Sequence, residues 1–426
     1  MVVCGRPGRT PSTLFRQTRT CSSLAPVTAA TPPDVFAPAS LGPVTLRNRT
    51  VKAATFEGRA PHGVVTDDLI DYHLAVARGG VGLTTVAYLA VAPEGRTHRE
   101  VIVVGPATKP GLARMAEAIH ETGAAIAGQV GHAGPVANGR SNGVHALSAS
   151  KMPSPLSMQM VRSATERDLT RITKAYVDTA RVLVDAGFDV LELHMAHSYL
   201  ISSFLAPGLN RRKDRWGGAL ENRARLARQV ALAVREKVGD RAAVTAKISV
   251  SDGFKGGVRT EDSIDFARLL EADGALDALQ LSGGSSLMNP MYLFRGDVPQ
   301  KEFAATMPPL VRWGMKTPMG KGFLKHYDFE EGYFFDKASQ FRAALAMPLM
   351  QLGGINRLAT MEKAMAAGFD FVAMGRALLR EPDLVARLRE GRQQAGTCIH
   401  CNRCMPTIYS GTRCPVISPE IPKVSS

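Results

Sequence analysis

Eight short apolar segments alternate with eight longer segments of helical periodicity, and this alternation constrains the fold more than any other feature. The apolar segments, which predict β-strands, are 51–56, 81–87, 124–130, 188–194, 243–249, 276–282, 349–353 and 371–374. The segments that predict helices are 67–78, 109–121, 167–186, 220–238, 261–272, 337–346, 358–366 and 384–389. Strands apolar enough for burial on both faces, each followed by a helix, are typical of a parallel sheet.

We predict that this sheet closes into a (β/α)8 TIM barrel of the α/β class, because that barrel needs eight strand–helix units. An open doubly wound sheet has the same alternation, but no GxGxxG sequence follows the first strand, which argues against it. Two connections, 133–164 and 283–336, are much longer than the others. Since both follow strands, we expect them at the end of the barrel where barrel enzymes carry their active sites.

The 426 residues divide into a leader at 1–33, a barrel with an N-terminal capping hairpin at 34–392, and a Cys-rich tail at 393–426. The leader holds four arginines and no acidic residue, which indicates a disordered segment or an organellar transit peptide. We expect a cytoplasmic protein, with an organellar location as the alternative. A hydrophobic content of 45% excludes a disordered chain, and no apolar run is long enough to predict a membrane span.

The net charge of +14 suggests an anionic partner. Apart from Arg211, Arg212 and Lys213, the basic residues are dispersed, and none forms a stripe interleaved with aromatic residues. We therefore expect a phosphorylated small ligand, and neither nucleic acid nor a membrane. A homo-oligomer is left open by the sequence.

The predicted fourth strand ends in the most informative run, with His194, His197 and Tyr199 within six residues. Two histidines in this spacing could bind a metal, but we expect Glu192 to point away from them. Two hydrogen-bond donors that stabilise one oxyanion, with a tyrosine hydroxyl as proton donor, are the better chemical interpretation.

The ends of the seventh and eighth strands carry Gly353-Gly354 and Gly375-Arg376, which predict a phosphate site. Gln129, at the end of the third strand, offers a donor and an acceptor to the edge of an amide-like ring. Lys247 lies within the fifth strand, where a buried cation implies an anionic partner.

These motifs together resemble the old yellow enzyme family of FMN-dependent NADH:flavin oxidoreductases and ene reductases. The resemblance extends over most of residues 36–389, and the HxxHxY run at His194, His197 and Tyr199 is its most specific element. It implies a flavoprotein oxidoreductase that uses FMN, reduced by NADH or NADPH, to reduce the C=C bond of an α,β-unsaturated carbonyl such as an enone or enal. His194 and His197 would hold the carbonyl oxygen, and Tyr199 would protonate the substrate.

The same resemblance assigns FMN-binding residues. Gln129 would contact the pyrimidine edge and Lys247 the N1 and O2 region, while the two glycine pairs and Arg376 would bind the phosphate. Ala54 and Thr55 match the first-strand positions beside the flavin, where Ala54 replaces a usual proline. Lys247 stands where the family usually has arginine, so the charge is kept but the bidentate geometry is lost.

The tail contains a CxxCxxC run followed by one further cysteine: Cys398, Cys401, Cys404 and Cys414. It is similar to the iron–sulfur segment of 2,4-dienoyl-CoA reductase, although the third interval is one residue shorter here. Four thiolates could hold a [4Fe–4S] cluster or one Zn²⁺ ion, or the motif could be a structural remnant.

Three alternative functions follow from the same residues. One is an FMN-dependent dehydrogenase or demethylase that passes electrons to an Fe–S cluster. Another is a flavin-free, phosphate-binding barrel aldolase or isomerase with Lys247 as its Schiff-base residue. The third is a non-enzymatic metal-binding protein, which leaves His194, His197 and Tyr199 unexplained.

Overall fold

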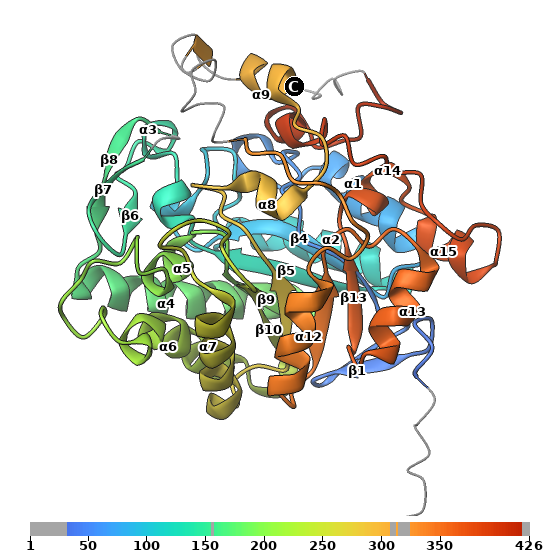
Figure 1. The fold of residues 1–426 in the computed structure, drawn as a ribbon, viewed down its shortest axis with the longest axis horizontal. Coiled ribbons are helices and arrows are strands. Elements are labelled where there is room, and N and C mark those ends of the chain that lie inside the picture. Colours follow the sequence, from blue (N-terminus) through green and yellow to red (C-terminus); the bar gives the residue numbers. More distant parts are fainter. Residues whose placement is uncertain (1–31, 155–156, 307–311, 314–323, 420–426) are drawn as a thin grey trace, which may run out of the picture. The chain divides into compact units, whose positions relative to one another are not determined.

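The computed structural model describes residues 32–154, 157–306, 312–313 and 324–419. Its centre is a closed barrel of eight strands, each parallel to both neighbours. In chain order the strands are β3 (Thr50–Lys52), β4 (Leu83–Ala90), β5 (Ala125–Gly131), β9 (Val190–Met195), β10 (Ala243–Ser249), β11 (Ala278–Ser282), β12 (Leu349–Leu352) and β13 (Phe371–Met374). The predicted TIM barrel is confirmed (Figure 1).

Helices follow the strands and form the outer layer of the barrel. They are α1 (Asp67–Arg78), α2 (Lys109–His120), α4 (Glu166–Val184), α6 (Leu220–Val238), α7 (Thr260–Asp273), α12 (Phe335–Ala344), α13 (Leu358–Ala366), α14 (Arg376–Arg380) and α15 (Leu384–Arg389). Local sequence fixes several ends: Thr165 and Asp168 form a capping box at the start of α4, and Gly274 ends α7 in the left-handed conformation.

A hairpin of β1 (Ala39–Leu41) and β2 (Val44–Leu46) covers the amino end of the barrel. Its Leu41 and Leu46 are fully buried in one apolar cluster with residues from all eight barrel strands, including Val51 and Val190. The predicted N-terminal capping hairpin is thereby confirmed.

The two long connections carry structure of their own. The one after β5 holds α3 (Gly139–Asn142) and a three-stranded sheet of β6 (Leu147–Ser148), β7 (Met152–Ser154) and β8 (Gln159–Ser163). The one after β11 holds α8 (Pro290–Phe294) and α9 (Gln300–Ala305), and α8 lies over the carboxyl end of the barrel (Figure 1).

One difference from the sequence prediction concerns the end of the first barrel strand. The first barrel strand ends at Lys52, so Ala54 and Thr55 lie in the loop beyond it rather than in a strand. Most of the predicted leader, residues 1–31, lies outside the described residues. Among the helices that the structure describes, none has the length and apolar character required to cross a membrane.

Candidate functional site

Residues at the carboxyl end of β9 form the centre of the site. The chain leaves the strand through a tight turn in which His197 and Ser198 both have positive φ angles, of 60° and 62°. Such angles cost of order 1 kcal/mol or more in a non-glycine residue and occur mainly where the surrounding contacts enforce them. Here the enforcing contact is between the Ser198 and Ser285 hydroxyl oxygens, which are 2.6 Å apart.

This turn folds Tyr199 back onto His194. Their rings are stacked, with centroids 4.0 Å apart and planes inclined by 10°. The His197 ring stands edge-on to His194, with centroids 5.1 Å apart. Thus the three residues that the sequence predicted to act together do form one cluster.

Both imidazoles in the cluster are buried and neutral at physiological pH. Burial, with a further contribution from the Lys247 charge, lowers the pKa of His197 to about 3. Burial also holds the pKa of His194 well below its usual range, assisted by His197 and Lys247. Each neutral ring carries one N–H donor. The His197 Nε2 atom lies 2.8 Å from the Ser282 hydroxyl oxygen, which orients that ring.

Lys247 and Gln129 share a buried carboxylate, that of Glu192. The Glu192 Oε1 atom accepts hydrogen bonds from Lys247 Nζ at 2.9 Å and from Gln129 Nε2 at 2.7 Å. All three side chains are almost inaccessible to solvent. The anionic partner that we predicted for Lys247 is therefore supplied by the protein itself. Glu192, which sequence reasoning placed away from the site, faces these groups because it lies two residues before His194 on the same side of β9.

The two glycine pairs lie at adjacent strand ends, since β12 and β13 are neighbours in the barrel. A Cβ atom added at Gly375 would meet only the Thr55 hydroxyl, at 3.8 Å, so this strand end is open and Thr55 adjoins it. Gly353 and Gly354 instead contact aromatic rings: a Cβ at Gly354 would lie 2.7 Å from Phe329 and Tyr333. The sequence had given no role to these rings. Ala54 is partly buried against the core beside Thr55.

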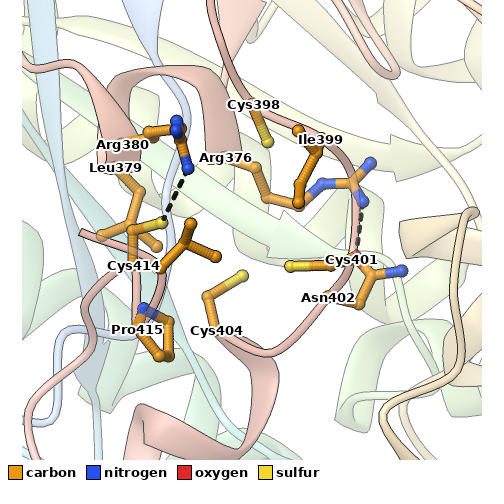
Figure 2. Close-up of a pocket in the computed structure, with 11 residues that line it drawn as sticks. Arg376, Leu379, Arg380, Cys398, Ile399, Cys401, Asn402, Cys404, Cys414 and Pro415 are labelled. Atoms are coloured by element: carbon orange, nitrogen blue, oxygen red, sulfur yellow. Dashed lines mark hydrogen bonds between the residues drawn. The ribbon is translucent and has the colours of Figure 1, made fainter. Parts of the chain in front are cut away.

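Arg376 lies between the glycine site and the cysteine tail. Its Nη1 donates to the backbone carbonyl of Arg295 and to Asn402 Oδ1, and its buried Nη2 has no hydrogen-bond partner among the described residues. Figure 2 shows its side chain beside the cysteines. Arg376 was predicted as a phosphate ligand, and Arg295 and Asn402 were missed, because only the tertiary fold brings them together.

The four tail cysteines line a single small cavity (Figure 2). None of the four is part of a disulfide bond, and all four are partly buried. Burial raises the pKa of the Cys404 thiol to about 12, opposed by the Arg376 charge and reinforced by the other three cysteines. Within the described ranges, no three Cys, His, Asp or Glu side chains are arranged to hold a single metal ion, the cysteines included.

Comparison with known proteins identifies relatives of this chain. The sequence profile of the NADH:flavin oxidoreductase / NADH oxidase family matches residues 34–282. The 4,4'-dithiodibutanoate disulfide reductase of Rhodococcus erythropolis is 53% identical over 390 residues, which span 92% of this chain and 96% of that protein. The NADH oxidase of Thermoanaerobacter brockii is 31% identical over 376 residues, but this chain spans only 53% of its length.

Solved structures agree with the observed architecture. The old yellow enzyme homologue from Zymomonas mobilis superposes with a TM-score of 0.70 at 22% identity, covering 92% of this chain and 99% of that one. A 2-naphthoyl-CoA reductase superposes with a TM-score of 0.74 at 23% identity, covering 88% of this chain and 55% of that one. At sequence identities this low, these comparisons support a shared fold alone.

Proposed function

The chain belongs to the NADH:flavin oxidoreductase / NADH oxidase family, FMN-dependent enzymes of the old yellow enzyme type, and from that premise we propose that it reduces the C=C bond of an α,β-unsaturated carbonyl at the expense of NAD(P)H. The observation that carries this proposal is the cluster of two neutral imidazoles and a tyrosine at the end of β9. The flavin-free aldolase or isomerase hypothesis is wrong for a member of this family, and Lys247 is engaged in an ion pair with Glu192.

The residues at the barrel mouth fit FMN. The Nη2 atom of Arg376, which is buried without a hydrogen-bond partner among the described residues, and the open strand end at Gly375 suit a phosphate. Gln129 and Lys247 suit the polar edge of the flavin ring. Thr55 adjoins Gly375. When bound, FMN accepts a hydride from NAD(P)H and delivers it to the substrate, while the protein supplies orientation and electrostatics.

His194 and His197 would bind the carbonyl oxygen of the substrate. Negative charge builds up on that oxygen as hydride reaches Cβ, so two prearranged N–H donors stabilise the transition state more than the substrate. Because both rings are buried and neutral, they donate hydrogen bonds without having to lose or gain a proton. Ser282 holds the His197 ring in place for this role.

Tyr199 would deliver the proton that the reaction requires at Cα. The overall change, C=C plus NAD(P)H plus H⁺ giving CH–CH plus NAD(P)⁺, needs one proton besides the hydride. The phenol is held in place by stacking on His194 and lies edge-on to Tyr88, with centroids 5.4 Å apart. A positioned donor of this kind contributes about 10²- to 10⁴-fold to a rate.

The experiment that tests this function is anaerobic mixing of the FMN-loaded protein with NADH or NADPH, followed by mixing of the reduced protein with cyclohexenone. We expect flavin bleaching in the first step and recovery of the flavin absorption, with saturated product, in the second. A protein that fails to take up FMN, or one that is reduced but never reoxidised by any enone or enal, would contradict the proposal.

A second candidate function is the reduction of a small disulfide, and the 53% identical Rhodococcus reductase favours it. This reaction also consumes one hydride and one proton: RS–SR plus NAD(P)H plus H⁺ gives two RSH and NAD(P)⁺. His194, His197 and Tyr199 would then stabilise and protonate the departing thiolate. Presenting the reduced protein with 4,4'-dithiodibutanoate and with cyclohexenone, and comparing the two reoxidation rates, decides between the candidates.

For the cysteine tail we propose a [4Fe–4S] cluster rather than Zn²⁺. Four thiols converge on one cavity, yet no subset in the described chain is drawn together around a single ion, which suits a larger group with four separate attachment points. The alternative function, a dehydrogenase or demethylase that exports electrons through this cluster, stays a prediction that depends on it.

A further inference from the structure

Arg295 is enclosed by aromatic rings in the long connection after β11. It follows α8 directly, and its guanidinium carbon lies 5.1 Å from the Tyr333 ring centroid and 5.2 Å from that of Tyr292. Tyr327 and Phe334 complete the enclosure at 5.8 and 5.9 Å. Cation–π contacts with four rings hold this half-buried side chain in place and bury its Nε atom.

Among the described residues, no carboxylate pairs with the charge of Arg295 inside this enclosure. Its Nε atom is buried and has no hydrogen-bond partner in the described ranges, and there it makes no ion pair with a carboxylate. The residue also adopts a φ angle of 40°, in the left-handed region that disfavours side chains. Buried donors and backbone strain both cost stability, and such costs concentrate at binding sites.

The surroundings of Arg295 are those of the predicted phosphate site. Arg376 donates to the Arg295 carbonyl at 2.9 Å, and its own Nη2 is buried without a partner in the described chain. Tyr333 joins the two arginines: burial raises the pKa of its hydroxyl, and the charges of Arg376 and Arg295, with a side-chain interaction between Tyr333 and Arg376, oppose that rise. Tyr333 also packs on Gly354.

Hydrogen bonds from Asn402 in the cysteine tail hold the backbone of Arg295. Asn402 Nδ2 donates to the Arg295 carbonyl at 3.0 Å and to the Asp297 carbonyl at 2.9 Å. The connection after β11 is thus bound to the same segment that holds Arg376. Two guanidinium groups near one tyrosine repel each other, and an oxyanion with two or more negative oxygens would relieve that repulsion and satisfy both buried donors.

We propose that Arg295 is a second guanidinium ligand, with Arg376, of the phosphate of FMN. This assignment rests on the proposed function, in which the chain binds FMN. Besides the strand-end glycines, the phosphate site would then include a residue from the connection after β11. A substrate carboxylate offers the same oxyanion chemistry, so the test separates the two sources.

The test compares FMN with riboflavin, which has the same ring system and lacks the phosphate. Apoprotein of the full chain is titrated with each flavin, and the dissociation constants are measured by quenching of flavin fluorescence. In Arg295→Gln we expect FMN affinity to fall by about 10- to 100-fold, as for loss of a charge-assisted hydrogen bond, and riboflavin affinity to change by less than about twofold. Arg295→Lys, which keeps a cation within the rings, should show a smaller loss that is again confined to FMN.

Arg403→Gln is the matched control, because Arg403 lies next to Asn402 but is exposed and paired with Glu302. It should bind both flavins like the wild type. An equal fall in FMN and riboflavin affinity in the Arg295 variants would overturn the proposal in favour of a structural role. Unchanged FMN affinity, with a raised KM for a carboxylate substrate but not for its methyl ester, would assign Arg295 to substrate instead. A wild-type protein that binds neither flavin would overturn the proposed function as well.

Discussion

The imidazole of His194 lies face to face with the phenol of Tyr199, with centroids 4.0 Å apart, although the two residues are five positions apart along the chain. Two consecutive left-handed residues, His197 and Ser198, make this contact geometrically accessible. The proposed oxyanion donor and the proposed proton donor therefore pack directly against each other, and several consequences can be measured.

Tyr199→Phe should slow reduction of the enone or disulfide by about 10²-fold or more, because the ring remains while the acidic hydroxyl is lost. Flavin reduction by NAD(P)H should stay within about twofold of the wild-type rate. Both half-reactions are measured by anaerobic stopped-flow absorbance. Equal slowing of the two would remove Tyr199 from the role of proton donor.

The buried histidines should make the folded protein sensitive to acid. The pKa of His197 is about 3 in the folded state and about 6.5 in the unfolded chain, so the unfolded state binds more protons once the pH falls below about 6.5. Stability is therefore fully present above that pH and is lost toward pH 3. For this one residue the loss is about 2 kcal/mol between pH 7 and pH 5.

His197→Gln removes this titration and keeps an amide with about the reach of Nε2, the atom that contacts Ser282. Urea unfolding of both proteins at the two pH values gives the comparison, and the variant should lose about 2 kcal/mol less than the wild type. Identical pH dependence in the two proteins would show that His197 does not remain neutral in the folded state.

Glu192→Gln should destabilise the protein by about 3–5 kcal/mol, because it leaves the buried Lys247 ammonium without its carboxylate. Glu236→Gln, at an exposed position of α6, is the control and should change stability by less than about 0.5 kcal/mol. Chemical denaturation of the apoproteins measures both. A loss for Glu192→Gln no larger than that of the control would mean that Lys247 finds another counterion.

Cys404→Ser should abolish the iron and acid-labile sulfide of protein purified without oxygen, because Cys404 is one of the four thiols on the cavity wall. Cys21→Ser, at a position outside the described residues, should leave both unchanged. Elemental analysis of the wild type with one zinc and no iron per chain would replace the proposed cluster by zinc.

The barrel could be predicted from the sequence because the secondary structure that each segment favours locally is the one that the barrel requires of it. The strand over 243–249 and the helices over 67–78 and 220–238 occur with the predicted bounds. The first strand was predicted too long, since residues 53–56 are apolar apart from Thr55 yet leave the sheet for a loop. Apolar character alone does not distinguish a strand from a buried loop.

The site was predicted where its residues lie close together in the sequence, as in His194, His197 and Tyr199. It was missed where distant segments meet. Arg295 and Asn402 are 107 residues apart, and their contact depends on where two loops end in three dimensions. Glu192 was missed for a different reason. We assigned its side chain to the face of β9 opposite His194, although residues two positions apart in a strand lie on the same face.

The hairpin that fills the amino end of the barrel has a kinetic consequence. Because Leu41 and Leu46 seal that end, we expect the nicotinamide and the oxidising substrate to enter by the opposite mouth and to exclude one another there. Excess of either compound should then inhibit by trapping the enzyme in the form that cannot use it. Steady-state rates at rising concentrations of both compounds should therefore show mutual substrate inhibition.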